Sequence, residues 1–61
     1  MYELWIEQHG QRVLLHKDSN STVTSDMATA LEEMVDVNSG IIIMIRQGGR
    51  TLCRKEINTE R

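Results

Sequence analysis

Apolar and polar residues alternate on both sides of His9-Gly10. If these two residues form a turn, the cross-strand pairs are Glu7 with Arg12, Ile6 with Val13, Trp5 with Leu14, Leu4 with Leu15 and Glu3 with His16. Alternation with a period of two is typical of a half-buried antiparallel strand pair, and glycine favours a two-residue turn. One face would then carry Tyr2, Leu4, Ile6, Val13 and Leu15, and the other Glu3, Trp5, Glu7, Arg12, Leu14 and His16. We therefore predict a β-hairpin over residues 2–17.

The apolar residues between Val23 and Asp36 have helical spacing. Thr24 or Ser25 can cap the first turn, and Asp26 would lie near the positive end of the helix dipole. Gly40 suits the left-handed conformation that often ends a helix. A sector of about 160° collects the apolar side chains Met27, Ala28, Ala30, Leu31, Met34 and Val35. We predict a helix of about three turns that packs this sector against a sheet.

A second hairpin is predicted around Gly48-Gly49. Its first strand is apolar at every position from Ile41 to Ile45, and its second strand is basic. A two-residue turn places Ile45 opposite Leu52, Met44 opposite Cys53, Ile43 opposite Arg54 and Ile42 opposite Lys55. A strand that is apolar on both faces fits the interior of a sheet better than its edge.

These elements predict one α+β domain over residues 1–61, with the order β-β-α-β-β. The strand order would be 2-1-3-4, all antiparallel, with one helix on one face. The uncovered face would show Trp5, Leu14 and either Ile42 and Met44 or their neighbours, with Arg12 and His16 around them. A large exposed apolar patch on a small protein marks an interface. We therefore expect a homodimer, formed through the sheet faces or through an edge strand.

Charge divides the chain unevenly around a net charge of −2. Residues 1–40 carry two basic and seven acidic side chains, whereas residues 41–61 carry five basic and two acidic ones. Glu32, Glu33 and Asp36 crowd the negative end of the predicted helix, where acidic side chains are unfavourable. Two explanations stay open. A basic neighbour such as Arg54 or Lys55 compensates them, or this acidic face binds a basic partner.

No residues combine into a catalytic, metal or cofactor site. Cys53 has only His9 and His16 as candidate bases, and nothing local places either within reach. We expect Cys53 to act as a small buried or half-buried hydrophobe. The two histidines lack the spacing of metal ligands. The sequence therefore predicts a protein that is not an enzyme.

The start of the chain lacks the basic and apolar regions of a signal peptide. Its longest apolar run is five residues, and spanning a bilayer takes about 20. With a single cysteine, these features predict a cytoplasmic protein.

Two functions fit this pattern. The first is a protein-binding module, an inhibitor or regulator, with the candidate residues Trp5, Leu14, Asp26, Glu32, Glu33 and Asp36. In size and plan the chain is similar to small inhibitors and regulators encoded by phages and other mobile elements. The alternative is a nucleic-acid-binding regulator that uses Arg46, Arg50, Arg54 and Lys55. A pI near 5.5 and the position of both aromatic residues at the other end of the chain count against it.

Overall fold

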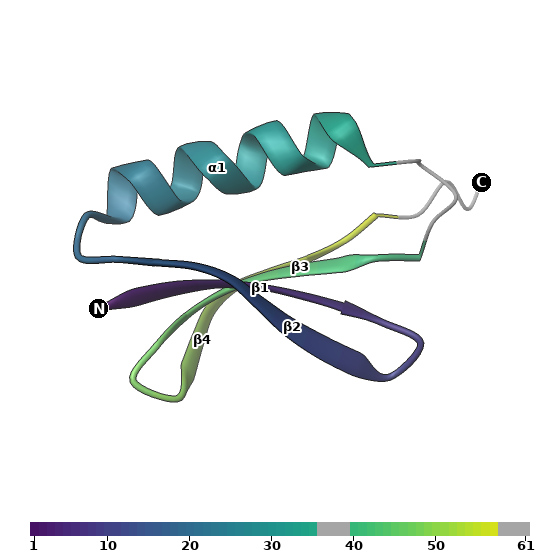
Figure 1. The fold of residues 1–61 in the computed structure, drawn as a ribbon, viewed down its shortest axis with the longest axis horizontal. Coiled ribbons are helices and arrows are strands. Elements are labelled where there is room, and N and C mark those ends of the chain that lie inside the picture. The colour runs from purple at the N-terminus through teal and green to yellow at the C-terminus, as the bar shows by residue number, and fades with distance from the viewer. Residues whose placement is uncertain (36–39, 58–61) are drawn as a thin grey trace.

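The fold is a four-stranded antiparallel sheet with one helix on one face (Figure 1). The computed structural model describes residues 1–35 and 40–57. Its elements are β1 (Tyr2–Gln8), β2 (Gln11–Asp18), α1 (Ser21–Met34), β3 (Ile42–Gln47) and β4 (Arg50–Glu56). The strand order is β2-β1-β3-β4, so the predicted α+β fold is confirmed.

Both predicted two-residue turns are present. The φ angles are 56° and 79° at His9-Gly10, and 58° and 80° at Gly48-Gly49. Positive φ at both central residues is the geometry of the turn that matches the twist of paired strands. Next to the first turn, the Arg12 Nε donates to Glu7 Oε1 at 3.0 Å, which confirms that cross-strand pair.

A β-bulge in β2 changes the predicted register. Trp5 pairs with Leu14 as expected, but Leu4 pairs with His16, so Leu15 is an extra residue. The predicted pairing of Leu4 with Leu15 was therefore wrong. An extra residue in an edge strand bends it and increases its twist.

The bulge also redirects the charged residues beyond it. Glu3 lies opposite Lys17, not opposite His16 as predicted, and its carboxylate is 4.0 Å from the Lys17 Nζ. His16 leaves the uncovered face and places its Nε2 3.3 Å from the Asp18 Oδ2.

A second bulge lies in the other edge strand, β4. Arg46 pairs with Thr51, but Ile45 pairs with Cys53, which makes Leu52 the extra residue. The predicted register was wrong by one residue beyond this point, because it assumed an uninterrupted ladder. As a result, Lys55 lies opposite Ile43 rather than Ile42.

The helix begins earlier than predicted, after Asn20. The Asn20 Oδ1 accepts from the amides of Thr22 and Val23 at 2.9 and 3.4 Å. Asn20 is itself held by its amide, which donates to the Asp18 Oδ1 at 2.7 Å. This hydrogen bond is the main reason why the pKa of Asp18 is lowered, and the hydrogen bond with the His16 side chain is the second.

The predicted caps therefore lie inside the helix. Thr24 is buried, and its Oγ1 donates to the carbonyl of Asn20 at 3.2 Å. Asp26 falls in the second turn, so the first turn contains no acidic residue. Asn20 was not predicted as the cap, because the helix was expected to begin at Thr24 or Ser25.

We expect Asn20→Ala to lower the free energy of unfolding by about 1 kcal/mol, because two amides of the first turn lose their acceptor. Urea unfolding followed by circular dichroism measures this loss. Ser19→Ala is the control, and an equal loss in both variants would contradict the capping role.

The helix ends at Met34, before the predicted end at Gly40. The amide of Val35 donates to the carbonyl of Leu31 at 3.1 Å and closes the last turn. Gly40 has the positive φ expected of a residue that ends a helix, 72°, but the helix has already ended at Met34. Asp36, Asn38 and Ser39 lie outside the described residues.

The core lies between α1 and the two inner strands. Its buried members are Leu4, Ala28, Ile43 and Ile57, with Ile6, Leu31, Val35, Ile41 and Ile45 packed against them. Ile57 joins the core directly after β4, where its amide donates to the carbonyl of Ile41 at 2.8 Å. Residues 58–61 lie outside the described part of the chain. The one helix among the described residues is too short and too polar to span a membrane.

Candidate protein-binding surface

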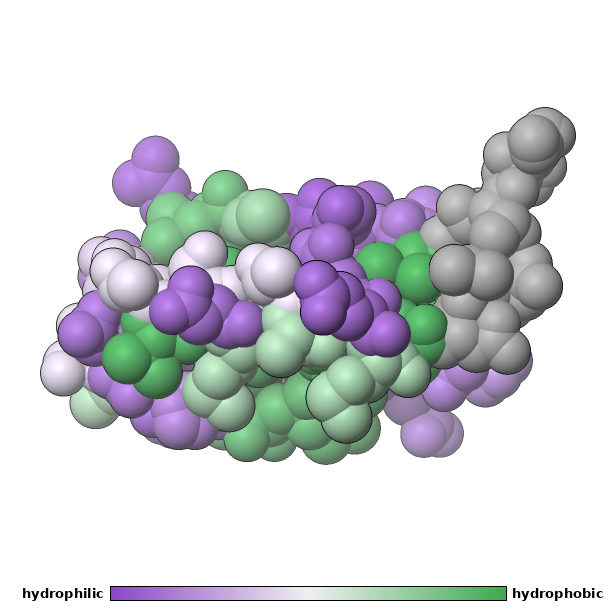
Figure 2. All heavy atoms as spheres, turned by 90° about the horizontal axis from the view of Figure 1, so that it is seen from above, coloured by the Kyte–Doolittle hydropathy of each residue, from purple (hydrophilic) through white to green (hydrophobic). Residues whose placement is uncertain are grey.

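Apolar side chains form an open groove between α1 and the edge strand β2. Its volume is about 230 Å³, and its lining residues are Leu4, Leu15, Met27, Ala30, Leu31 and Met34. We call these six residues the apolar groove. In Figure 2, which looks down on α1, apolar residues form a green band along the lower border of the helix.

Several residues of the apolar groove are strongly exposed. Met34 is 80% exposed and Leu15 is 45% exposed, and Met27 also belongs to the exposed large hydrophobic residues. Val13 on β2 and Val23 on α1 extend the exposed apolar area along the same two elements. Exposed apolar residues that gather in this way mark an interaction site on a small protein.

The apolar groove was not predicted from the sequence, because all apolar residues of the helix were expected to lie in the core. The face of α1 that packs on the sheet consists of Thr24, Ala28 and Leu31, and Val35 continues it directly after the helix. This stripe is narrower than the predicted sector, so Met27, Ala30 and Met34 extend past the sheet contact. The width of the apolar sector was the available signal, since one sheet contact needs only about 100° of a helix.

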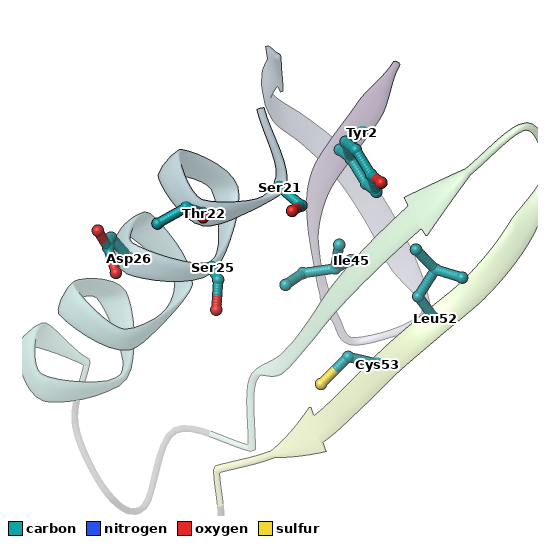
Figure 3. A pocket seen from close by; sticks show the side chains of 8 residues that line it. All are labelled: Tyr2, Ser21, Thr22, Ser25, Asp26, Ile45, Leu52 and Cys53. Carbon is teal, nitrogen blue, oxygen red and sulfur yellow. The ribbon is translucent and has the colours of Figure 1, made fainter. Parts of the chain in front are cut away.

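A second open pocket lies on the opposite flank of the helix (Figure 3), with a volume of about 390 Å³. Its lining residues are Tyr2, Ser21, Thr22, Ser25, Asp26, Ile45, Leu52 and Cys53. Cys53 is exposed, so the prediction of a buried or half-buried cysteine was wrong. The bulge at Leu52 turns Cys53 to the helix side of an edge strand that α1 does not cover. No histidine lines this pocket, and the described residues contain no metal-binding cluster.

The predicted acidic face of the helix divides into two parts. Glu32 accepts from the Lys55 Nζ at 2.9 Å, and this bond raises the pKa of Lys55. The predicted compensation by a basic neighbour is therefore confirmed for Glu32. Asp26 and Glu33 are exposed, and neither forms an ion pair with a described residue. Asp36 lies outside the described residues.

The uncovered sheet face carries the predicted residues Trp5, Leu14, Ile42 and Met44, but most of them are less exposed than predicted. One row across it contains Leu14, Trp5, Met44 and Arg54. Met44 is only 3% exposed, and Trp5 is half-buried. The Trp5 Nε1 donates to the Glu3 Oε1 at 2.9 Å, which fixes the indole on this face. Leu14 is the apolar residue of this row that stays exposed.

The four cations of the second hairpin do not form one patch. Arg54 lies on the uncovered face beside Met44, whereas Lys55 binds Glu32 on the helix side. The Arg46 Nη2 donates to the carbonyl of Gly49 at 2.8 Å. Arg50 lies next to the turn and forms no ion pair with a described residue.

Comparisons of this chain with protein-family models, curated proteins and solved structures found no match.

Proposed function

We propose that this protein is a small, non-enzymatic protein-binding module, an inhibitor or regulator, and that its partner binds in the apolar groove. The observation that supports the proposal is the exposure of Leu15, Met27 and Met34 around one open groove. Burying such side chains against a partner removes apolar area from water, which is the main favourable term in association. Methionine adapts its shape to the contacting surface, which suits a binding site.

The other predicted contacts fit around this site. Asp26 and Glu33 would supply charge on the solvent-facing side of α1, next to Ala30 of the apolar groove. Trp5 and Leu14 stay a predicted second contact area on the uncovered sheet face. We place the protein in the cytoplasm on the basis of its single thiol, and we propose a phage or another mobile element as its origin.

Leu15→Lys is expected to weaken partner binding at least tenfold, because it places a charge in the apolar groove. Leu52→Lys is the matched control. Both leucines are bulge residues of edge strands, with exposures of 45% and 46%, and they line opposite flanks of α1. The measurement is quantitative co-purification of bound proteins from the native host.

The same two variants can also contradict the assignment of the partner to the apolar groove. If Leu52→Lys loses the bound protein while Leu15→Lys retains it, the partner binds on the other flank. Circular dichroism establishes that both variants are folded, so that a loss of binding can be assigned to the surface.

Nucleic-acid binding is the second candidate function, and one observation favours it. Arg54 lies in the same cross-strand row as Trp5, so an aromatic ring is closer to the basic strand than the sequence order predicted. Single-stranded nucleic acids bind to surfaces that combine aromatic and basic side chains. Glu3, Glu7 and Glu56 share this face and oppose phosphate binding.

A fluorescence titration with single-stranded DNA and RNA at low salt tests the second function. Binding that is lost in both Trp5→Leu and Arg54→Ala would support it. No binding, or binding that both variants retain, would exclude the uncovered face as a nucleic-acid site.

A further inference from the structure

We infer that the occupant of the apolar groove is an amphipathic α-helix with basic residues along one flank. This inference rests on the proposed protein-binding function and specifies the chemistry of the partner. It follows from the shape of the groove, from the interrupted edge of β2 and from the carboxylates beside the groove.

The shape of the groove suits a helix. Met27, Ala30 and Met34 follow one another at spacings of three and four residues, so they form one stripe along α1. With Val23 the stripe is about 16 Å long, the length of a helix of about three turns. Ala30, the smallest of these side chains, lies between the two methionines and leaves room for a ridge of side chains from a second helix.

The edge of β2 is poorly suited to a partner strand. A strand that extends a sheet needs a regular row of free amides and carbonyls. The bulge at Leu15 interrupts that row in the middle of β2 and turns Leu15 towards the groove. The bulge therefore favours a side-chain contact above the edge over main-chain pairing along it.

Asp26 and Glu33 lie on the solvent-facing side of α1, next to Ala30 of the stripe, and Asp26 also lines the pocket on the other flank. Ala30 follows Asp26 by four residues and precedes Glu33 by three, so both acidic residues are its neighbours on the helix surface. Neither has an ion-pair partner among the described residues, whereas Glu32 on the other flank is bound by Lys55. A partner helix with lysine or arginine on the facing flank would supply the missing charges.

The same carboxylates oppose an antiparallel pairing of two copies of this chain in the groove. If two stripes packed antiparallel around a two-fold axis perpendicular to the helices, Asp26 and Glu33 of both copies would lie on the same side of the interface. Four like charges would then face one another, which opposes association. A basic helix turns this repulsion into attraction.

Synthetic 14-residue peptides with a fluorescent label test the inference. The first peptide has leucines at helical three- and four-residue spacing with lysines along one flank, and the second has glutamates in place of the lysines. A third peptide has the composition of the first in a strand-like alternating order. Fluorescence anisotropy with the full chain at low salt is expected to give binding at least tenfold tighter for the first peptide than for the other two.

Charge variants of the chain locate the contact. The double variant D26N/E33Q is expected to weaken binding of the lysine peptide about tenfold, because two exposed ion pairs are each worth about two- to fivefold. E32Q removes one charge on the opposite flank and is expected to leave binding unchanged. Leu15→Lys is expected to abolish binding, and Leu52→Lys to retain it.

Four results would overturn the inference. Equal binding of the lysine and glutamate peptides would remove the charge argument, and preferred binding of the alternating peptide would assign the groove to a strand. Light scattering across a dilution series tests the predicted homodimer, and a dimer that Leu15→Lys dissociates would make the second copy the occupant. If no peptide binds but Leu15→Lys still loses the protein captured from the host, the proposed function stands and only the helical, basic partner is excluded.

Discussion

Leu4→Ala is expected to lower the free energy of unfolding by about 3 kcal/mol, and so to leave a large part of the protein unfolded. Leu4 is 2% exposed and lies in the cluster that joins α1 to the inner strands. Alanine would leave a cavity under the helix that the surrounding side chains fill only in part. The free energy of unfolding of a domain of this size is only a few kcal/mol, so one such cavity would remove most of it.

Urea unfolding followed by Trp5 fluorescence and by circular dichroism measures this effect. Val13→Ala is the matched control, because Val13 is an exposed apolar residue of the same hairpin. Its loss is expected to stay below about 1 kcal/mol, since little buried area is removed. A similar loss in both variants would show that α1 covers β2 more completely than the structure indicates.

Met44→Ala is expected to cost about 2 kcal/mol, although Met44 lies on the face that α1 does not cover. Met44 is 3% exposed between Trp5 and Arg54 in its row, so this face has a small buried centre of its own. Met44→Leu keeps most of the side-chain volume, so its loss of unfolding free energy is expected to be much smaller than that of Met44→Ala. Urea unfolding of the two variants measures the difference.

Leu14→Ala completes this test, because Leu14 is an exposed residue of the same row. A cost for Met44→Ala no larger than that for Leu14→Ala would mean that Met44 is open to solvent. The uncovered face would then present the larger apolar patch that the sequence predicted.

The candidate surface was only partly predictable from the sequence. The hydrophobic pattern identified Met27, Ala30 and Met34 as apolar positions of a helix but assigned them to the core. The bond between Glu32 and Lys55 was one of the two explanations left open for the acidic helix end. Glu32 rather than Glu33 binds Lys55 because Glu32 is on the flank of α1 that faces β4, and this follows from tertiary packing.

The bulge in β2 left a signal in the sequence that simple alternation overlooks. Val13, Leu14 and Leu15 are three consecutive apolar residues, which a strand with one buried face does not need. With Leu15 as the extra residue, Leu14 stays opposite Trp5 while Leu15 reaches the groove. The predicted register treated the run as part of one regular strand, so every pairing beyond the bulge was displaced by one residue.

The sequence by itself determined the order of the elements, both turns, the strand order and the apolar inner strand. These features follow from local backbone preferences and from the spacing of apolar residues, which alternates in the strands and has a helical period in the helix. Both can be read from residues that are close together in the sequence. Only the tertiary structure decided where each ladder shifts and how far one helix reaches across four strands. A 14-residue helix on a twisted sheet covers the inner strands first, so the apolar side chains beyond that contact stay exposed along β2.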